Sequence, residues 1–160
     1  MPIQVGEKVP SLTLYHKTAD GVAEISTDEI FNGKKVVLFA LPGAFTPTCS
    51  ASHLPGYVVK SDELFAKGVD RIVCLSVNDA HVMHAWGEQQ NVGDRVMMIA
   101  DGSGYFTHAV GLELDRRQGG MGMRSQRYAM VVNDGIVELL NIEAPGKFEV
   151  SDADTILASL

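Results

Sequence analysis

Apolar residues gather in short runs along the chain, and turn-forming residues separate the runs. Runs of four to seven mostly apolar residues bounded by turn signals predict buried strands. Two weaker runs near the N-terminus, at 9–15 and 22–25, predict a strand pair across the turn Asp20-Gly21. The stronger runs predict the central strands, at Val36–Leu41, Arg71–Val77, Val96–Ala100, Tyr128–Val132 and Ile136–Leu140.

Between the strands, apolar residues recur at helical spacing, and polar capping residues precede several of these segments. Ser26 to Glu29 has the spacing of a capping box and predicts a short helix that stops at Asn32-Gly33. We expect a second helix to carry Cys49, to be interrupted at Pro55-Gly56 and to end at Gly68. Further helices are predicted after Asp79, over 103–110 and from Ser151, whereas the glycine-containing stretch 112–124 predicts a loop.

This order of strands and helices predicts an α/β fold, in which helices cover both faces of a central mixed sheet. The stretch Asn133-Asp134-Gly135 between the last two strands is a strong hairpin signal, so the sheet should close with an antiparallel pair. With 160 residues and no linker, residues 1–160 are predicted to form a single domain.

Composition narrows the functional classes. The net charge of −7 argues against a nucleic-acid partner, which would need a basic face. No apolar run approaches the roughly 20 residues that span a membrane, so no membrane partner is expected. Only two cysteines are present, Cys49 and Cys74, without a Cys-x-x-Cys spacing. Together with the lack of a signal-peptide pattern, this suits reactive thiols in a reducing compartment and predicts a cytoplasmic protein.

The stretch from Leu41 to Ser50 carries the candidate chemistry. Two prolines and a glycine end the strand before it, and Cys49 falls in the first turn of the predicted helix. Unpaired N–H groups and the helix dipole favour a negative charge there, so a thiol at this position is biased toward the nucleophilic thiolate. Thr46 adds a hydroxyl three residues earlier. A buried structural cysteine in a tight turn is the alternative.

The run Pro42-x-x-x-Thr46-x-x-Cys49 resembles the active-site signature of the peroxiredoxins. The fuller Pro-Gly-Ala-Phe-Thr-Pro-x-Cys, followed by His53-x-Pro55-Gly56, resembles their peroxiredoxin-5-like (plant type II) subgroup. The resemblance runs over essentially the whole chain. It implies a thioredoxin-like fold and a thiol peroxidase that reduces hydrogen peroxide and small alkyl hydroperoxides, without a metal or other cofactor.

The resemblance also implies roles for individual residues. Cys49 would attack the hydroperoxide and become a sulfenic acid. Arg127, at the start of the strand before the hairpin, would stabilise the thiolate and the leaving oxygen. Only the resemblance selects Arg127, because sequence physics alone could not prefer it to Arg124, Arg116 or Arg117. Thr46 would hydrogen-bond at the sulfur and the peroxide. Pro42 would shield the thiolate, and backbone N–H groups at Gly43 and Cys49 would complete the substrate pocket.

Several roles stay open at this stage. Arg124 is a second positive group near the thiol or a solvated loop residue. His53 is a base or, as we favour, a histidine held by local hydrogen bonds. Cys74, mid-strand, matches the second cysteine of plant type II members and is a resolving thiol or, more in keeping with its place, structural. An external thiol would then regenerate Cys49, with glutathione and glutaredoxin ahead of thioredoxin.

Two other functional classes compete with the peroxidase. A disulfide oxidoreductase would normally need a second thiol in Cys49-Ser50-Ala51-Ser52, and a thiol sensor or holdase would not need Thr46 and Arg127 for turnover. His81 and His84 suggest a metal pair only weakly, and the glycines at 119–122 do not match a phosphate-binding loop. By resemblance, a homodimer is expected, with Phe45 and the glycine-rich loop as candidates for its interface.

Overall fold

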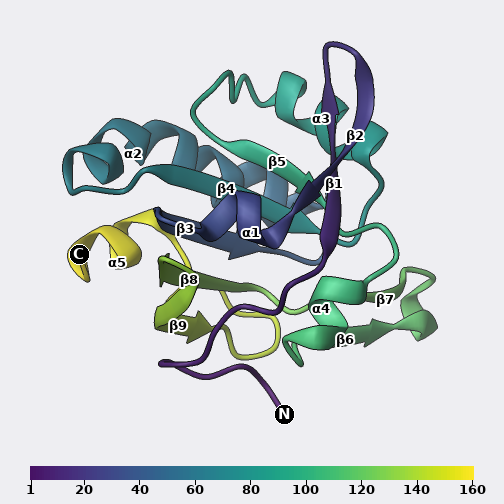
Figure 1. The fold of residues 1–160 in the computed structure, drawn as a ribbon. Coiled ribbons are helices and arrows are strands. Elements are labelled where there is room, and N and C mark those ends of the chain that lie inside the picture. Colours follow the sequence, from purple (N-terminus) through teal and green to yellow (C-terminus); the bar gives the residue numbers. More distant parts are fainter.

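The computed structural model describes all residues, 1–160, and is built on one seven-stranded mixed sheet (Figure 1). The strands lie in the order β2-β1-β5-β4-β3-β8-β9. Their bounds are Thr13–Thr18 (β1), Gly21–Ser26 (β2), Lys35–Ala40 (β3), Arg71–Ser76 (β4), Met97–Ala100 (β5), Tyr128–Asn133 (β8) and Ile136–Ile142 (β9).

Strands β3, β4 and β5 are parallel, and antiparallel partners flank them on both sides. The middle strands are almost continuously apolar because both faces of the sheet are covered. Alternate residues of β3 serve different layers: Val37 and Phe39 pack into one core, and Val36 and Leu38 into the other.

Helices complete the two layers. On the face of Phe39 lie α2 (Leu54–Ala66), α3 (Ala80–Gln89) and α5 (Ala153–Ala158), and on the face of Leu38 lie α1 (Thr27–Phe31) and α4 (Tyr105–Ala109). Side chains near the N-terminus, such as Ile3 and Val9, add to the second core. The predicted fold class, a mixed sheet with helices on both faces, is confirmed. No helix has both the length and the hydrophobicity to cross a membrane.

The predicted interruption at Pro55-Gly56 is wrong. A single π turn, η1 (Cys49–His53), leads directly into α2, which continues through both residues. Within an α-helix, proline lacks the N–H that would donate to the carbonyl four residues earlier, and its ring crowds that carbonyl. The wider π turn lies where that crowding would occur, so the proline is tolerated.

Three other expectations are also corrected. The stretch 112–124 is not simply a loop, because β6 (Glu113–Arg116), the 3₁₀ turn η2 (Arg117–Gly119) and β7 (Gly122–Ser125) form a small hairpin. Short strands with few apolar residues have no strong pattern and depend on tertiary contacts. The first strand begins at Thr13 rather than at residue 9, and the last helix begins at Ala153, capped by Asp152.

Candidate active site

The turn between β3 and the first long helix places Cys49 at the helix start. Pro47 and Thr48 are already helical, and Cys49 follows, fully buried, at the beginning of the π turn. The Thr46 hydroxyl donates to the Gly43 carbonyl at 2.7 Å, and the Ser50 N–H donates to the Thr46 carbonyl at 2.9 Å. These bonds tighten the turn that presents the thiol.

Two backbone donors in this turn have no acceptor in the protein. Neither the Gly43 nor the Cys49 N–H makes a hydrogen bond with any backbone or side-chain group. Free N–H groups at a helix start favour negative charge nearby. The Thr46 hydroxyl donates its hydrogen to the Gly43 carbonyl, and its oxygen can still accept a hydrogen bond from another group.

Arg127 reaches Cys49 from far along the sequence. Strands β3 and β8 pair with Ala40 opposite Tyr128, so the residue before β8 lies beside the end of β3. From there the Arg127 Nη2 donates to the Cys49 Sγ at 3.1 Å. A guanidinium is always charged, so this contact stabilises a negative charge on the sulfur.

His53 holds the other arm of the same guanidinium. Its Nδ1 lies 2.8 Å from the Arg127 Nη1, and its Nε2 lies 3.1 Å from the Ser151 carbonyl. A neutral imidazole with its proton on Nε2 satisfies both contacts, because it accepts from the arginine and donates to the carbonyl. Burial, and then the charge of Arg127, lowers the pKa of His53 to about 3. The residue is therefore held by hydrogen bonds and makes none to the sulfur.

Glu143 organises the loop that holds His53 in place. Its carboxylate accepts from the N–H groups of Glu149, Val150 and Ser151 and from the Ser151 hydroxyl, at 2.7 to 2.9 Å. The Ser151 carbonyl in turn accepts from both His53 and the Tyr57 hydroxyl. Burial raises the pKa of Glu143, but the hydrogen bonds from Ser151 and its neighbours outweigh burial, and the net pKa is lowered.

Arg124 is not a solvated loop residue, because its guanidinium is half-buried against the active-site turn. Its Nε donates to the Met121 carbonyl at 2.8 Å, and its Nη1 donates to the carbonyls of Val77 and Pro42 at 3.3 and 3.4 Å. A Cβ at Gly43 would lie 3.1 Å from this Nη1, so the glycine leaves room for the arginine. Arg124 thus stabilises the turn through backbone carbonyls and makes no hydrogen bond to Cys49.

Cys74 lies in β4, opposite Phe39, and is fully buried in the same core layer as Cys49. Both cysteines are free thiols. Burial, and then the nearby Cys49, raises the pKa of Cys74 well above its usual value. Cys74 is thus a poor nucleophile in this state, although its role as a resolving or structural residue stays a prediction.

Sequence reasoning did not find Glu143, Ser151 or the support from α3. The Trp86 indole N–H donates to the Ser50 hydroxyl at 3.0 Å, and Gln90 donates to the Ser50 carbonyl at 3.2 Å. Both bonds fix the turn that carries Cys49. No local sequence signal connects these residues to position 50. No group of three histidine, cysteine, aspartate or glutamate side chains could hold a metal ion, His81 and His84 included.

Comparison with known proteins assigns the chain to a family. The family model described as Redoxin matches residues 4–157. Peroxiredoxin-2B of Arabidopsis thaliana is 48% identical over 160 residues, which cover 99% of each chain. The chain belongs to the peroxiredoxins. The peroxiredoxin resemblance predicted from the active-site turn is confirmed, and this peroxiredoxin is a cysteine-dependent peroxidase, an oxidoreductase.

Solved structures agree with the assignment. Reduced Prx3 of Vibrio vulnificus in complex with H₂O₂ has a TM-score of 0.95 and 56% identity, over 98% of both chains. A Burkholderia cenocepacia protein described as a putative thioredoxin reductase has a TM-score of 0.98 and 51% identity, over 100% of this chain and 99% of that one. These neighbours confirm the thioredoxin-like fold of this peroxiredoxin.

Proposed function

We propose that this peroxiredoxin reduces hydrogen peroxide and small alkyl hydroperoxides through a sulfenic acid on Cys49. The Cys49 thiolate attacks the terminal oxygen of ROOH. A sulfur–oxygen bond forms, the peroxide bond breaks, and RO⁻ takes a proton and leaves as the alcohol or water. The observation that carries this proposal is the 3.1 Å contact between the Arg127 guanidinium and the Cys49 sulfur.

The surroundings of the sulfur suit this reaction. Arg127 and the two free N–H groups of the turn offer donors for the charge that develops on the leaving oxygen. Thr46 offers an acceptor for the peroxide hydrogen. The H₂O₂ complex of the similar Vibrio vulnificus protein supports the same substrate here.

Steady-state peroxide consumption tests the proposal. We expect Cys49→Ser to abolish turnover. Arg127→Ala should lower kcat/KM for H₂O₂ by about 10² to 10³, as expected for loss of one oxyanion-stabilising donor. Arg117→Ala is the matched control, because Arg117 pairs with Asp115 at 2.6 Å. Full activity in Cys49→Ser would refute the mechanism, and a fast sulfenic acid without turnover would favour a thiol sensor.

For regeneration, we propose an external thiol: glutathione with glutaredoxin first, thioredoxin second. Two observations support an external source. Cys74 is buried in the middle of a strand, and no other cysteine follows it. Mass spectrometry after one equivalent of H₂O₂ checks the point, because an internal disulfide between Cys49 and Cys74 would show as a loss of two hydrogens.

The proposal also includes a homodimer and a cytoplasmic location. Phe45 supports the dimer, because its side chain is 49% exposed although it stands in the active-site turn with a positive φ of 64°. A bulky residue adopts that conformation only at a cost in free energy. An exposed aromatic side chain held in such a turn suits a contact with a second subunit. Two free thiols suit a reducing compartment.

A further inference from the structure

A cavity of about 400 Å³ opens beside the active-site turn. Pro42, Thr48 and Arg127 form its inner wall. Strand β6 contributes Arg116 to one side, and the loop 144–148 forms the other. The cavity therefore adjoins Arg127, which donates to the Cys49 sulfur, but the peroxide chemistry proposed above does not use its outer part.

The charges around this cavity are unbalanced. Three basic side chains line it, Arg116, Arg127 and Lys147, and Glu143 is its one acidic residue. The Glu143 carboxylate already accepts hydrogen bonds from four donors in the loop 149–151. Arg116 and Lys147, in contrast, make no side-chain hydrogen bond or ion pair within the protein. On a chain with a net charge of −7, this is a local positive site.

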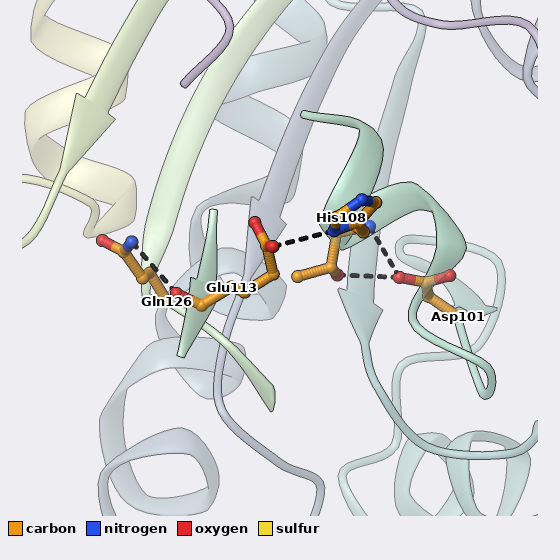
Figure 2. A network of polar contacts seen from close by, with 5 residues as sticks. Asp101, His108, Glu113 and Gln126 are labelled. Atoms are coloured by element: carbon orange, nitrogen blue, oxygen red, sulfur yellow. Dashed lines mark hydrogen bonds and ion pairs between the residues drawn. The ribbon is translucent and has the colours of Figure 1, made fainter. Parts of the chain in front are cut away.

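The strand that carries Arg116 is anchored rather than loose. Figure 2 shows Glu113, at the start of β6, between two partners: the His108 Nδ1 lies 2.9 Å from its carboxylate, and Gln126 donates to its carbonyl at 3.2 Å. Gln126 itself lines the cavity. The neighbouring Arg117 is bound to Asp115 and does not line the cavity. Of the two adjacent arginines, only Arg116 is therefore free to meet a ligand.

We propose that this cavity binds a small thiol that carries carboxylate groups, with glutathione as the fitting example. Arg116 and Lys147 would pair with its carboxylates and direct its sulfur toward Cys49. The inference rests on the proposed function, because only a sulfenic acid on Cys49 gives the thiol something to reduce. Charge pairing explains why an anionic thiol would enter this site better than a neutral one.

Reduction of the Cys49 sulfenic acid at this site consumes two thiol molecules. The thiol sulfur attacks the Cys49 sulfenic acid, the S–S bond forms, and the S–O bond breaks with release of water. A second thiol then attacks the mixed disulfide, so that the small disulfide RSSR leaves and Cys49 is reduced. Since Cys49 is fully buried, the first attack requires a local opening of the active-site turn.

The test isolates the reductive half of the cycle. Protein is oxidised with one equivalent of H₂O₂ and mixed with glutathione or with glutathione diethyl ester, a matched thiol without free carboxylates. The signal is the fluorescence of Trp86, the only tryptophan. Its indole N–H donates a hydrogen bond to Ser50, the residue after Cys49. Mass spectrometry of quenched samples identifies the sulfenic acid and the mixed disulfide. The variants are Arg116→Ala, Lys147→Ala and their double, with Arg117→Ala as control.

We expect the double variant to lose about tenfold in the second-order rate constant for glutathione, as two partly exposed ion pairs would give. Its rate constant for the diethyl ester should change less than twofold, and Arg117→Ala should match wild type with both thiols. An equal loss with both thiols, no loss with either, or no reduction by glutathione at all would overturn the glutathione site. Failure of peroxide to form the sulfenic acid would instead overturn the proposed function on which the site rests.

Discussion

At the residue scale, Thr46 and Arg127 complement each other at the thiol. Arg127 donates to the sulfur, whereas Thr46 has given its own hydrogen to Gly43 and keeps an acceptor oxygen. A hydroperoxide carries one donor hydrogen and two acceptor oxygens, so the pair can orient it for attack. This division of roles depends on which way one hydroxyl hydrogen points, and the sequence does not contain that information.

Thr46 can be tested with two substitutions. Thr46→Val removes the acceptor while keeping the branched shape, and Thr46→Ser keeps the hydroxyl. We expect the valine variant to lose about 10² in kcat/KM for H₂O₂ in stopped-flow assays, and the serine variant to stay within about fivefold of wild type. Equal activity of the valine variant would show that the hydroxyl serves only the turn.

His53 acts on Arg127 rather than on the sulfur. In His53→Leu the Arg127 Nη1 loses its acceptor, so the guanidinium is less firmly placed. We expect a loss of about tenfold in the rate of Cys49 oxidation. His53→Gln, whose amide oxygen can replace Nδ1, should recover most of it. If leucine and glutamine variants lose the same activity, the histidine acts through packing with the Phe39 and Phe148 rings.

At the scale of elements, the loop between β9 and α5 depends on one carboxylate. Glu143→Gln replaces an anionic acceptor of four donors with an amide that has a single oxygen. Hydrogen bonds to charged groups contribute about 1.5 to 3 kcal/mol each. We therefore expect urea denaturation to show a loss of about 2 kcal/mol or more, whereas Glu149→Gln, on an exposed side chain in the same loop, should change little.

The same elements show where pattern reasoning succeeds. The capping box of α1 is present, with the Glu29 N–H bonded to the Ser26 hydroxyl. The Asn133-Asp134-Gly135 hairpin pairs β8 with β9, and Asp134 adopts a positive φ of 48°. Both signals are local. The hairpin β6–β7 was not predicted, because its few apolar residues acquire their partners only in the folded chain.

At the scale of the whole molecule, burial of His53 makes stability depend on pH. The unfolded imidazole titrates near 6.5, and in the folded chain the pKa of His53 is lowered to about 3. The unfolded chain thus binds the extra proton between these values, and stability falls as the pH falls through 6.5. The lowered pKa of Glu143 adds a second loss only below its unfolded value of 4.5.

Urea denaturation between pH 6.5 and 4.5 therefore measures the contribution of His53 to the pH dependence of stability separately from that of Glu143. We expect wild type to lose stability with a slope that approaches about 1.4 kcal/mol per pH unit. His53→Gln should flatten the slope in this window by most of that amount. An unchanged slope would mean that another group controls the acid sensitivity.

The expected dimer is also tested on the whole molecule. Phe45→Asp places a charge on the exposed side chain of the active-site turn and should shift the protein toward monomer in light scattering after size exclusion. Val59→Asp is the matched control, because Val59 is 76% exposed on α2 and lies away from that turn in sequence. Identical masses for wild type and Phe45→Asp would remove Phe45 from the interface.

What the sequence determined by itself was local: the apolar runs of the central strands, the turn that places a cysteine at a helix start, and the family pattern around it. These follow from backbone geometry and short-range hydrogen bonds. Tertiary structure decided which distant groups meet there. Only the pairing of β3 with β8 brings Arg127 to Cys49, and only the fold links Glu143 to His53 or gathers Arg116 and Lys147 around one cavity. Such contacts join positions dozens of residues apart, and strand register rather than local pattern sets them.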